Sequence, residues 1–268
     1  EPEEPHINLD LEQNRLSVSA SLTVRQIYNY LVEKGYTLTG LPSYPDVTIG
    51  GCIAANVHGQ NHYREGGFKK NIIDLTIFHP KYGQIVVSPQ DSTDVFDLTV
   101  GGFGLTGVII EATLRVIPIH TNLLECYVRR FDTLFDGYQM LVSDSDRYDF
   151  FHSWVNLSDL SKKGERGFYY AAKYVDYKKI IGNYLEPDWQ HRKHFAIKPN
   201  LFGTRLLRGA NKLYYFVTAR ASTKVSVLSD FIFPSRSKLW YFSMFGSRGL
   251  IEHQVLIPHR SVEVYLKA

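Results

Sequence analysis

The sequence predicts an α+β protein made of two domains. Its 268 residues exceed what one hydrophobic core usually holds, so two domains of about 100–150 residues are expected. In the first part, β-rich runs are joined by glycine- and proline-containing turns, which is typical of hairpins. The second part continues as strand, helix, strand and strand, which indicates an antiparallel sheet with helices on one face. We place the boundary near Pro118, with domains at 1–118 and 119–268.

The composition excludes several protein classes. With 44% hydrophobic and 21% charged residues, the chain has the make-up of an ordinary globular protein. No apolar run reaches the roughly 20 residues that cross a bilayer. A net charge of +3 without a basic, base-stacking motif argues against nucleic acid as a partner. Cys52 and Cys126 lie far apart in apolar surroundings, which favours buried thiols, and the ten histidines lack the spacing of metal ligands.

The first elements are a hairpin and an amphipathic helix. Residues Ile7–Leu11 and Leu16–Ala20 alternate around a polar turn. Thr23 then opens a capping-box pattern, and Gly35 ends the helix. The apolar positions between them recur at helical spacing: Val24, Ile27, Tyr28, Leu31 and Val32.

The stretch Leu41–His62, LPSYPDVTIGGCIAANVHGQNH, combines a proline-containing turn, a glycine pair, a run of small residues and a His-Gly-Gln-Asn cluster. The pair Gly50-Gly51 lets the backbone approach a ligand, and a helix that begins there points free N–H groups at an anion. This pattern predicts a phosphate or cofactor site. The alternative is a tight turn followed by a packed helix.

A second glycine cluster, Val100–Gly107, follows two strands, Ile72–Phe78 and Gln84–Ser88, and a short helix, Asp91–Leu98. It holds four glycines in the seven positions 101–107 and leads into the β-branched strand Val108–Ile119. Because glycine costs roughly 0.5–1 kcal/mol of order relative to alanine, we expect a planar or bulky group to approach this backbone. The pattern does not match G-x-G-x-x-G between a strand and a helix, which argues against a nicotinamide site.

The remaining elements are expected to form the second domain. Asp132 is predicted to cap a helix that runs to Val142. The predicted strands are Leu123–Arg129, Tyr148–Val155, Phe168–Tyr174, Tyr214–Ala219, Ser226–Phe233 and Ile251–Ile257. Between Asp176 and Lys212 the periodicity fades and basic residues accumulate. That segment is either a solvated surface or a lid that meets a phosphate and an anionic membrane.

The glycine segments resemble a known family. Thr48–Asn61, TIGGCIAANVHGQN, and Thr99–Ile109, TVGGFGLTGVI, with the hairpin Asp74–Ile85 between them, resemble the vanillyl-alcohol-oxidase-type (VAO/PCMH) FAD-linked oxidases. Phe231–Pro234 and Gly249–Pro258 resemble the substrate-domain strands of the family's polyprenyl-phosphoryl-ribose oxidase branch. The resemblance implies the second half of an FAD-binding domain, followed by a substrate domain, with FAD as the cofactor. The family's early glycine-rich loop and late lysine have no counterpart, so we expect a chain truncated at both ends.

The resemblance also implies the site residues. Those expected to bind FAD are Thr48, Ile49, Gly50, Gly51, His58, Gly59, Gln60, Asn61 and Ile109, the last on the adenine side. His58 is the expected catalytic residue, orienting substrate or flavin; the alternative is a histidine that closes a helix C-terminus.

Substrate contacts are implied for Gln60, Glu252 and Gln254. The chain departs from the ribose-oxidase pattern at three positions, since Gln60 replaces a lysine, Glu252 a glutamine and Phe242 an asparagine. The implied reaction is FAD-dependent oxidation of a secondary hydroxyl of a sugar, with a polyprenyl-phosphoryl pentose as the favoured substrate.

Two alternatives stay open: an aldonolactone or alditol oxidase acting on a free sugar, and an inactive carbohydrate-binding relative. The implied setting is polysaccharide biosynthesis for the cell wall, in the cytoplasm or peripherally at the inner membrane. The implied partners are a short-chain reductase that acts on the keto product and a membrane surface, with no nucleic acid.

Overall fold

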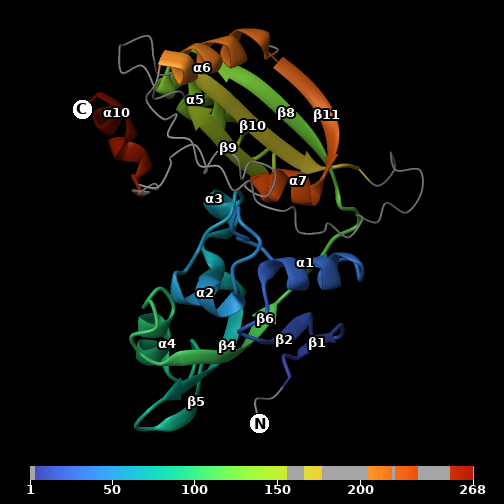
Figure 1. Cartoon of the computed structure of the whole chain (residues 1–268), viewed down its shortest axis with the longest axis vertical. Coiled ribbons are helices and arrows are strands. Elements are labelled where there is room, and N and C mark those ends of the chain that lie inside the picture. The colour runs from blue at the N-terminus through green and yellow to red at the C-terminus, as the bar shows by residue number, and fades with distance from the viewer. Residues whose placement is uncertain (1–3, 156–165, 177–204, 219–220, 235–253, 268) are drawn as a thin grey trace. The chain divides into compact units, whose positions relative to one another are not determined.

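The computed structural model describes residues 4–155, 166–176, 205–218, 221–234 and 254–267 (Figure 1). Contacts divide the chain into two compact units. The first unit comprises Glu1–Leu123, Val175–Trp189 and Val227–Arg236, and the second comprises Leu124–Tyr174, Gln190–Ser226 and Ser237–Ala268. The chain thus passes between the units several times: it leaves the first unit after Leu123 and returns to it at Val175 and again at Val227.

The first unit is built on a five-stranded antiparallel sheet in the order β1-β2-β6-β4-β5. Its strands are β1 Ile7–Asp10, β2 Arg15–Ser19, β4 Ile72–His79, β5 Gly83–Val87 and β6 Val108–Arg115. A small second sheet pairs β3 Tyr36–Thr37 with β7 Ile117–Pro118. Both predicted hairpins, β1-β2 and β4-β5, are confirmed. They could be predicted because turn residues and alternation are local signals.

Short helices join these strands, and most of them bury apolar side chains. They are α1 Val24–Val32, α2 Ile49–Ala54, α3 His62–Glu65, the 3-10 helix η1 Phe68–Asn71 and α4 Thr93–Thr99. The buried residues of α1 are the five predicted from helical spacing. Leu16 and Val18 of β2 and Leu114 of β6 are fully buried, as expected for alternate positions that face a core.

Replacing Thr23 with alanine is expected to lower the free energy of unfolding by about 1 kcal/mol. Thr23 Oγ1 accepts from the N–H of Gln26 at 3.3 Å, and Gln26 Oε1 accepts from the N–H of Thr23 at 2.9 Å, so both halves of the predicted capping box are present. Urea unfolding followed by circular dichroism measures the change. Gln26→Glu preserves both acceptors and should retain most of the stability; an unchanged midpoint for Thr23→Ala would contradict the role of the cap.

A helix, rather than the predicted strand Ser226–Phe233, returns the chain to the first unit. Strand β11, Ala221–Val227, ends where α7, Leu228–Ile232, begins. Leu228 donates its N–H to Asn122 O at 2.6 Å, and the fully buried Phe233 meets Tyr28 of α1 edge to face at 5.2 Å. The strand prediction is wrong because the buried residues of this segment, Leu228, Phe231 and Ile232, follow helical spacing.

The second unit holds a four-stranded sheet in the order β11-β8-β10-β9. Strands β8 Leu123–Phe131, β10 Gly167–Tyr174 and β9 Phe150–Val155 pair antiparallel, as predicted. Helix α5, Leu134–Asp144, follows β8. Its cap is Thr133, whose Oγ1 accepts from the N–H of Asp136 at 3.1 Å, and not the expected Asp132.

The two long helices of this unit lie on opposite faces of its sheet. Gly137 of α5 packs so closely on Phe131 that a Cβ there would lie 3.0 Å from the ring. Tyr215 of α6, Arg205–Val217, forms a buried cluster with Val128 and Phe168. Positions 128 and 131 of one strand face opposite ways, so the prediction of helices on one face is wrong.

The same residues correct the predicted strand Tyr214–Ala219, whose residues up to Val217 belong to helix α6. Tyr215 is buried and its neighbours are exposed. One buried residue between exposed ones is found in a single turn of a helix as well as in a short strand, so the pattern did not distinguish the two.

The second unit ends in the 3-10 helix η4, His259–Ser261, and α10, Val262–Lys267. In the predicted strand Ile251–Ile257, residues 254–257 are not in a strand, and the earlier ones lie outside the described residues. Most of the basic segment 176–212 and Phe242 lie outside them too. Within the described ranges, no helix has the length and apolar character to cross a membrane.

Candidate functional site

Helix α2 begins at the first glycine segment with its leading N–H groups already bonded. Thr48 Oγ1 accepts from Gly51 N–H at 3.1 Å, while the N–H groups of Ile49 and Gly50 donate, both at 2.8 Å, to carbonyls of residues 22 and 20. The expectation of free N–H groups aimed at an anion is therefore wrong. The turn that ends β2 folds back onto the start of α2 and takes those donors.

The two glycines of this segment have different surroundings. A Cβ on Gly50 would lie 3.1 Å from the Cβ of Ala20, so glycine allows α2 to pack against the end of β2. Gly51 and Thr48 are exposed, and a Cβ on Gly51 would meet only Thr48 Oγ1 within 4 Å. Ile49 is fully buried. The accessible part of this segment is therefore Thr48 and Gly51.

The two glycine segments meet through backbone hydrogen bonds. Gly101 donates its N–H to Ile53 O at 3.0 Å, and Phe103 donates its N–H to Ala54 O at 2.9 Å. These bonds satisfy the last carbonyls of α2. Segments 48–61 and 99–109, far apart in sequence, therefore form one structure in the first unit.

Turn geometry accounts for the second cluster of glycines. Gly101, Gly104 and Gly107 have φ of +85°, +81° and +141°, a region that L side chains rarely adopt. A Cβ on Gly102 would clash with the carbonyl oxygen of Leu98. Backbone geometry alone therefore accounts for these glycines, and the approach of a planar or bulky group to this backbone stays a prediction.

Large apolar side chains are nevertheless exposed around this turn. Leu98, Phe103 and Leu105 are 66%, 78% and 91% exposed, all within eight residues. Nothing lies within 4 Å of the position a Cβ would take on Gly104, between the last two of them. Such a group of exposed apolar side chains beside an open glycine marks a surface suited to an apolar, planar ligand.

The His58–Asn61 loop is held by its own stretch of chain. His58 forms an isolated antiparallel bridge with Gly67. A Cβ on Gly59 would lie 2.7 Å from Leu41 O, and Asn61 Oδ1 accepts from Gly40 N–H at 3.2 Å. The loop is therefore held by residues on both sides of it, Gly40 and Leu41 before it and Gly67 after it. Gly59 is buried, whereas the half-buried Gln60 and the exposed His58 remain accessible.

His58 and His62 form a pair of exposed imidazoles with ring centroids 5.0 Å apart. Partial burial and the nearby charge of His58 lower the pKa of His62, so His62 favours the neutral form. The final carbonyls of α2 are satisfied by backbone N–H groups, including Val57 N–H on Cys52 O at 3.0 Å. Capping of α2 therefore does not require the imidazole of His58.

The other expected site residues belong to other parts of the chain. Ile109 is half-buried on β6, opposite Ile77 of β4. Gln254 is exposed and belongs to the second unit, and Glu252 lies outside the described residues. Among the residues that the structure describes, no cluster of His, Cys, Asp and Glu could hold a metal ion.

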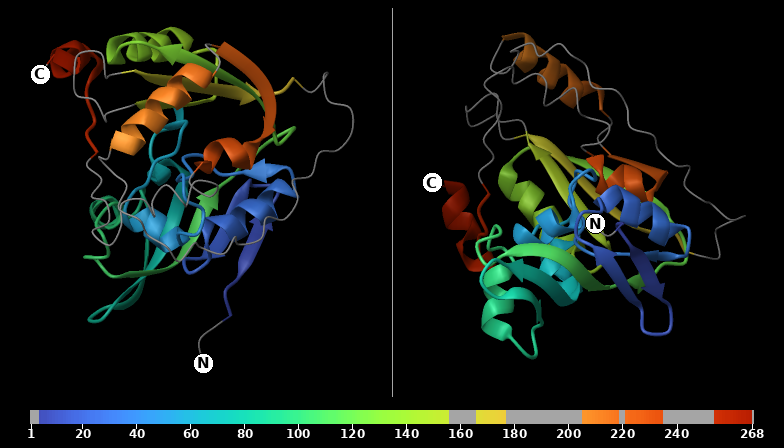
Figure 2. Two further views of the ribbon diagram at one scale, coloured as in Figure 1. Left: turned by 45° about the horizontal axis from the view of Figure 1, so that its top comes forward. Right: turned by 60° about the horizontal axis from the view of Figure 1, so that its bottom comes forward.

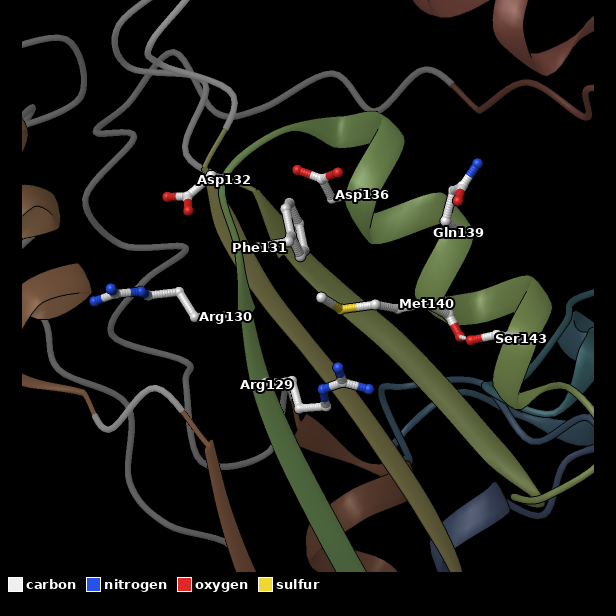
Figure 3. Close-up of a pocket in the computed structure, with 8 residues that line it drawn as sticks. All are labelled: Arg129, Arg130, Phe131, Asp132, Asp136, Gln139, Met140 and Ser143. Atoms are coloured by element: carbon white, nitrogen blue, oxygen red, sulfur yellow. Dashed lines mark hydrogen bonds between the residues drawn. The ribbon is translucent and has the colours of Figure 1, made fainter.

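A pocket of about 380 Å³ that the sequence did not indicate lies in the second unit, between the end of β8 and α5 (Figure 3). Its lining residues are Arg129, Arg130, Phe131, Asp132, Asp136, Gln139, Met140 and Ser143. Its charged groups have internal partners. Tyr215 donates its hydroxyl to Asp132 Oδ1 at 2.6 Å, the Arg130 guanidinium lies 4.5 Å from the centroid of the Tyr215 ring, and Thr133 donates to Asp136 Oδ2 at 2.8 Å.

Tyr215 is the centre of that arrangement. Burial, followed by the hydrogen bond to Asp132, raises the pKa of Tyr215 to about 12. The phenol therefore stays protonated and donates to Asp132 at neutral pH. These contacts indicate a structural role, because they tie α6 to the end of β8.

Comparisons with known proteins support a cofactor site at the first glycine segment. Residues 4–88 match the family model described as FAD binding domain. The chain is 23% identical over 273 residues to decaprenylphosphoryl-beta-D-ribose oxidase of Mycolicibacterium smegmatis, covering 96% of this chain and 58% of that protein. It is 28% identical over 138 residues to D-arabinono-1,4-lactone oxidase of Eremothecium gossypii, covering 50% and 26%. It is also 27% identical over 137 residues to the mitochondrial L-galactono-1,4-lactone dehydrogenase of Arabidopsis thaliana, covering 51% and 22%.

The chain therefore spans between about a fifth and three-fifths of the length of these relatives. The domain match identifies FAD as the cofactor. The exposed side chains of Phe103 and Leu105 suit its apolar ring systems. They fit its pyrophosphate less well, because the leading N–H groups of α2 are already bonded.

Proposed function

We propose that this chain, whose residues 4–88 match an FAD binding domain, forms part of an FAD-dependent oxidoreductase of the vanillyl-alcohol-oxidase type that oxidises a secondary hydroxyl of a sugar. When bound, FAD supplies the acceptor for the hydride that leaves the carbon. The observation that carries the proposal is the junction of the two glycine segments within the FAD-binding unit, beside exposed apolar side chains.

The chain's own residues supply position and electrostatics in this proposal. The exposed Thr48 and Gly51 contact the cofactor, and Phe103 and Leu105 cover its apolar parts. His58, exposed on a loop fixed by its bridge to Gly67, orients the reacting hydroxyl or the flavin. Of the remaining assignments, Asn61 and Ile109 are proposed for the cofactor, and Gln60, Glu252 and Gln254 for the sugar. Ile49, Gly50 and Gly59 pack within the chain and support the backbone of the site.

A polyprenyl-phosphoryl pentose is the substrate that we propose. The similarity to the ribose oxidase extends over 96% of this chain, whereas the similarity to the lactone oxidase covers half. The similarity to the ribose oxidase therefore includes the second half of the chain. We propose that residues 1–118 form the FAD-binding domain and that residues 119–268 form the domain that binds the sugar. A short-chain reductase would then act on the keto product, and the enzyme would work at the inner membrane or in the cytoplasm.

Replacing His58 with alanine is expected to slow reduction of the flavin by about tenfold to a hundredfold, because a positioning contact at the reacting group is lost. Bleaching of the flavin absorbance in the absence of oxygen, after addition of a polyprenyl-phosphoryl ribose, measures the rate. His62→Ala is the matched control, because it removes the neighbouring exposed imidazole. Equal rates in the two variants would argue against a role for His58.

The same assay separates the alternatives. Bleaching by an aldonolactone and not by the lipid-linked sugar would favour the free-sugar oxidase, to which the match with D-arabinono-1,4-lactone oxidase points. A colourless protein that takes up no added FAD would reject the oxidase and favour a carbohydrate-binding relative.

A further inference from the structure

Helix α6 presents an apolar stripe on its surface. Leu213, Phe216 and Val217 are 64%, 60% and 69% exposed. They stand at positions i, i+3 and i+4, so they share one face of the helix. Three large apolar side chains on one exposed face are more than the single exposed residues that need no explanation.

Tyr215 determines which way the stripe points. It is only 4% exposed and packs with Val128 and Phe168 of the sheet. Since an α-helix turns by about 100° per residue, Tyr215 lies nearly opposite the centre of the stripe. The stripe therefore points away from the sheet on which Tyr215 packs. The course of helix α6 is drawn in orange in Figure 2.

The border of the stripe is basic and aromatic. Lys212 is exposed on one side of it. Tyr214, on the other side, is 45% exposed, and its hydroxyl lies 3.3 Å from that of Tyr170. The sequence of α6, RLLRGANKLYYFV, contains arginine and lysine but no aspartate or glutamate. A basic helix with an apolar face and lysine or tyrosine at its border is typical of a helix that lies in a membrane interface.

We propose that the Leu213–Phe216–Val217 stripe docks on the surface of a membrane that contains anionic lipids. The stripe enters the boundary between headgroups and acyl chains, and the Lys212 ammonium extends to the lipid phosphates. A second copy of the chain is a poorer occupant, because a symmetric contact would bring two acid-free basic helices together. The inference rests on the proposed function in one respect. The polyprenyl group would hold the proposed substrate in the bilayer, so the enzyme would meet this substrate at a membrane surface.

Vesicle co-sedimentation tests the proposal without substrate or flavin reduction, so its outcome is independent of the oxidase assay. The full 268-residue chain is mixed with phosphatidylcholine vesicles that contain or lack phosphatidylglycerol. Phe216→Ser/Val217→Ser should weaken binding to the anionic vesicles by about tenfold or more. Phe135→Ser/Val142→Ser is the matched control, with the same residue types exposed on α5, across the sheet from α6.

Lys212→Gln should weaken binding to anionic vesicles but leave any binding to neutral ones unchanged. Circular dichroism confirms that each variant is folded. The proposal is overturned if the unaltered protein stays in the supernatant with both vesicle types, or if the α5 pair weakens binding as much as the α6 pair. It is also overturned if sedimentation velocity shows a dimer that only the α6 pair dissociates, because a second copy would then cover the stripe.

Discussion

Replacing Gly102 with alanine is expected to destabilise the first unit by about 3 kcal/mol or more and to prevent retention of FAD. The added Cβ would clash with the carbonyl oxygen of Leu98, a backbone atom that no rotamer change can move aside. Relief requires the turn to shift. Its neighbours Gly101 and Phe103 hold the end of α2 through their N–H groups, so the shift would part the two glycine segments.

Gly104→Ala is the matched control. Gly104 also lies in the turn and has a φ of +81°, but nothing lies within 4 Å of the position its Cβ would take. Its replacement should cost only the backbone strain of a left-handed residue, about 1–2 kcal/mol. Hydrogen exchange of β4 and β6 amides reports the stability of this unit, and absorbance reports the flavin. If the two variants are equally stable, the contact with Leu98 does not restrict position 102.

Replacing Phe168 with alanine is expected to destabilise the second unit by about 3–5 kcal/mol. Its ring is fully buried and lies between Trp154 at 5.9 Å, Tyr214 at 5.3 Å and Tyr215 at 5.6 Å between centroids. Alanine would leave a cavity between the sheet and α6 that these rigid rings cannot fill without moving.

Phe216→Ala provides the comparison, since that ring is 60% exposed on the outer face of α6 and should change stability by about 0.5 kcal/mol or less. Because the units can unfold separately, a single thermal midpoint is a poor measure. Hydrogen exchange at β8 and β10, with near-ultraviolet circular dichroism for the aromatic cluster, reports the second unit. Similar losses in the two variants would mean that α6 does not pack on Phe168.

The first unit could be predicted from the sequence because its signals are local. The capping box at Thr23, the turn at Gly83 and the alternation on both sides of it fix short elements without reference to distant residues. Assignment of the two glycine segments to one structure came from their resemblance to a family, and their backbone hydrogen bonds agree with it.

Helices α6 and α7 could not be predicted in the same way. Tyr214–Val217 is rich in aromatic and β-branched side chains, which favour strands when read alone. These residues form α6 because Tyr215 finds a buried place against Val128 and Phe168, a contact between distant parts of the sequence. The same kind of contact, between Phe233 and Tyr28, accompanies helix α7.

The candidate site shows the same limit. The sequence identified the start of α2 as a place where N–H groups gather, but not that carbonyls of Ala20 and Leu22 would accept from them. Those acceptors belong to another element, and only the folded chain brings them within reach. The role of His58 is a proposal that the flavin assay tests.

The return of the chain at α7 has a consequence for the order of folding. Strands β8 and β11 are neighbours in their sheet, and Leu228 donates its N–H to Asn122 O, so the two ends of the segment between residues 123 and 227 lie side by side. Tyr28 and Phe233 are about two hundred residues apart in the chain, and joining them directly would carry a large loop-closure cost. As the ribosome releases the chain from its N-terminus, the surface of α1 that receives Phe233 stays exposed until the whole segment has been synthesised. Pairing of β8 with β11 would shorten that loop, so the sheet of the second unit would form before Phe233 completes the core of the first unit.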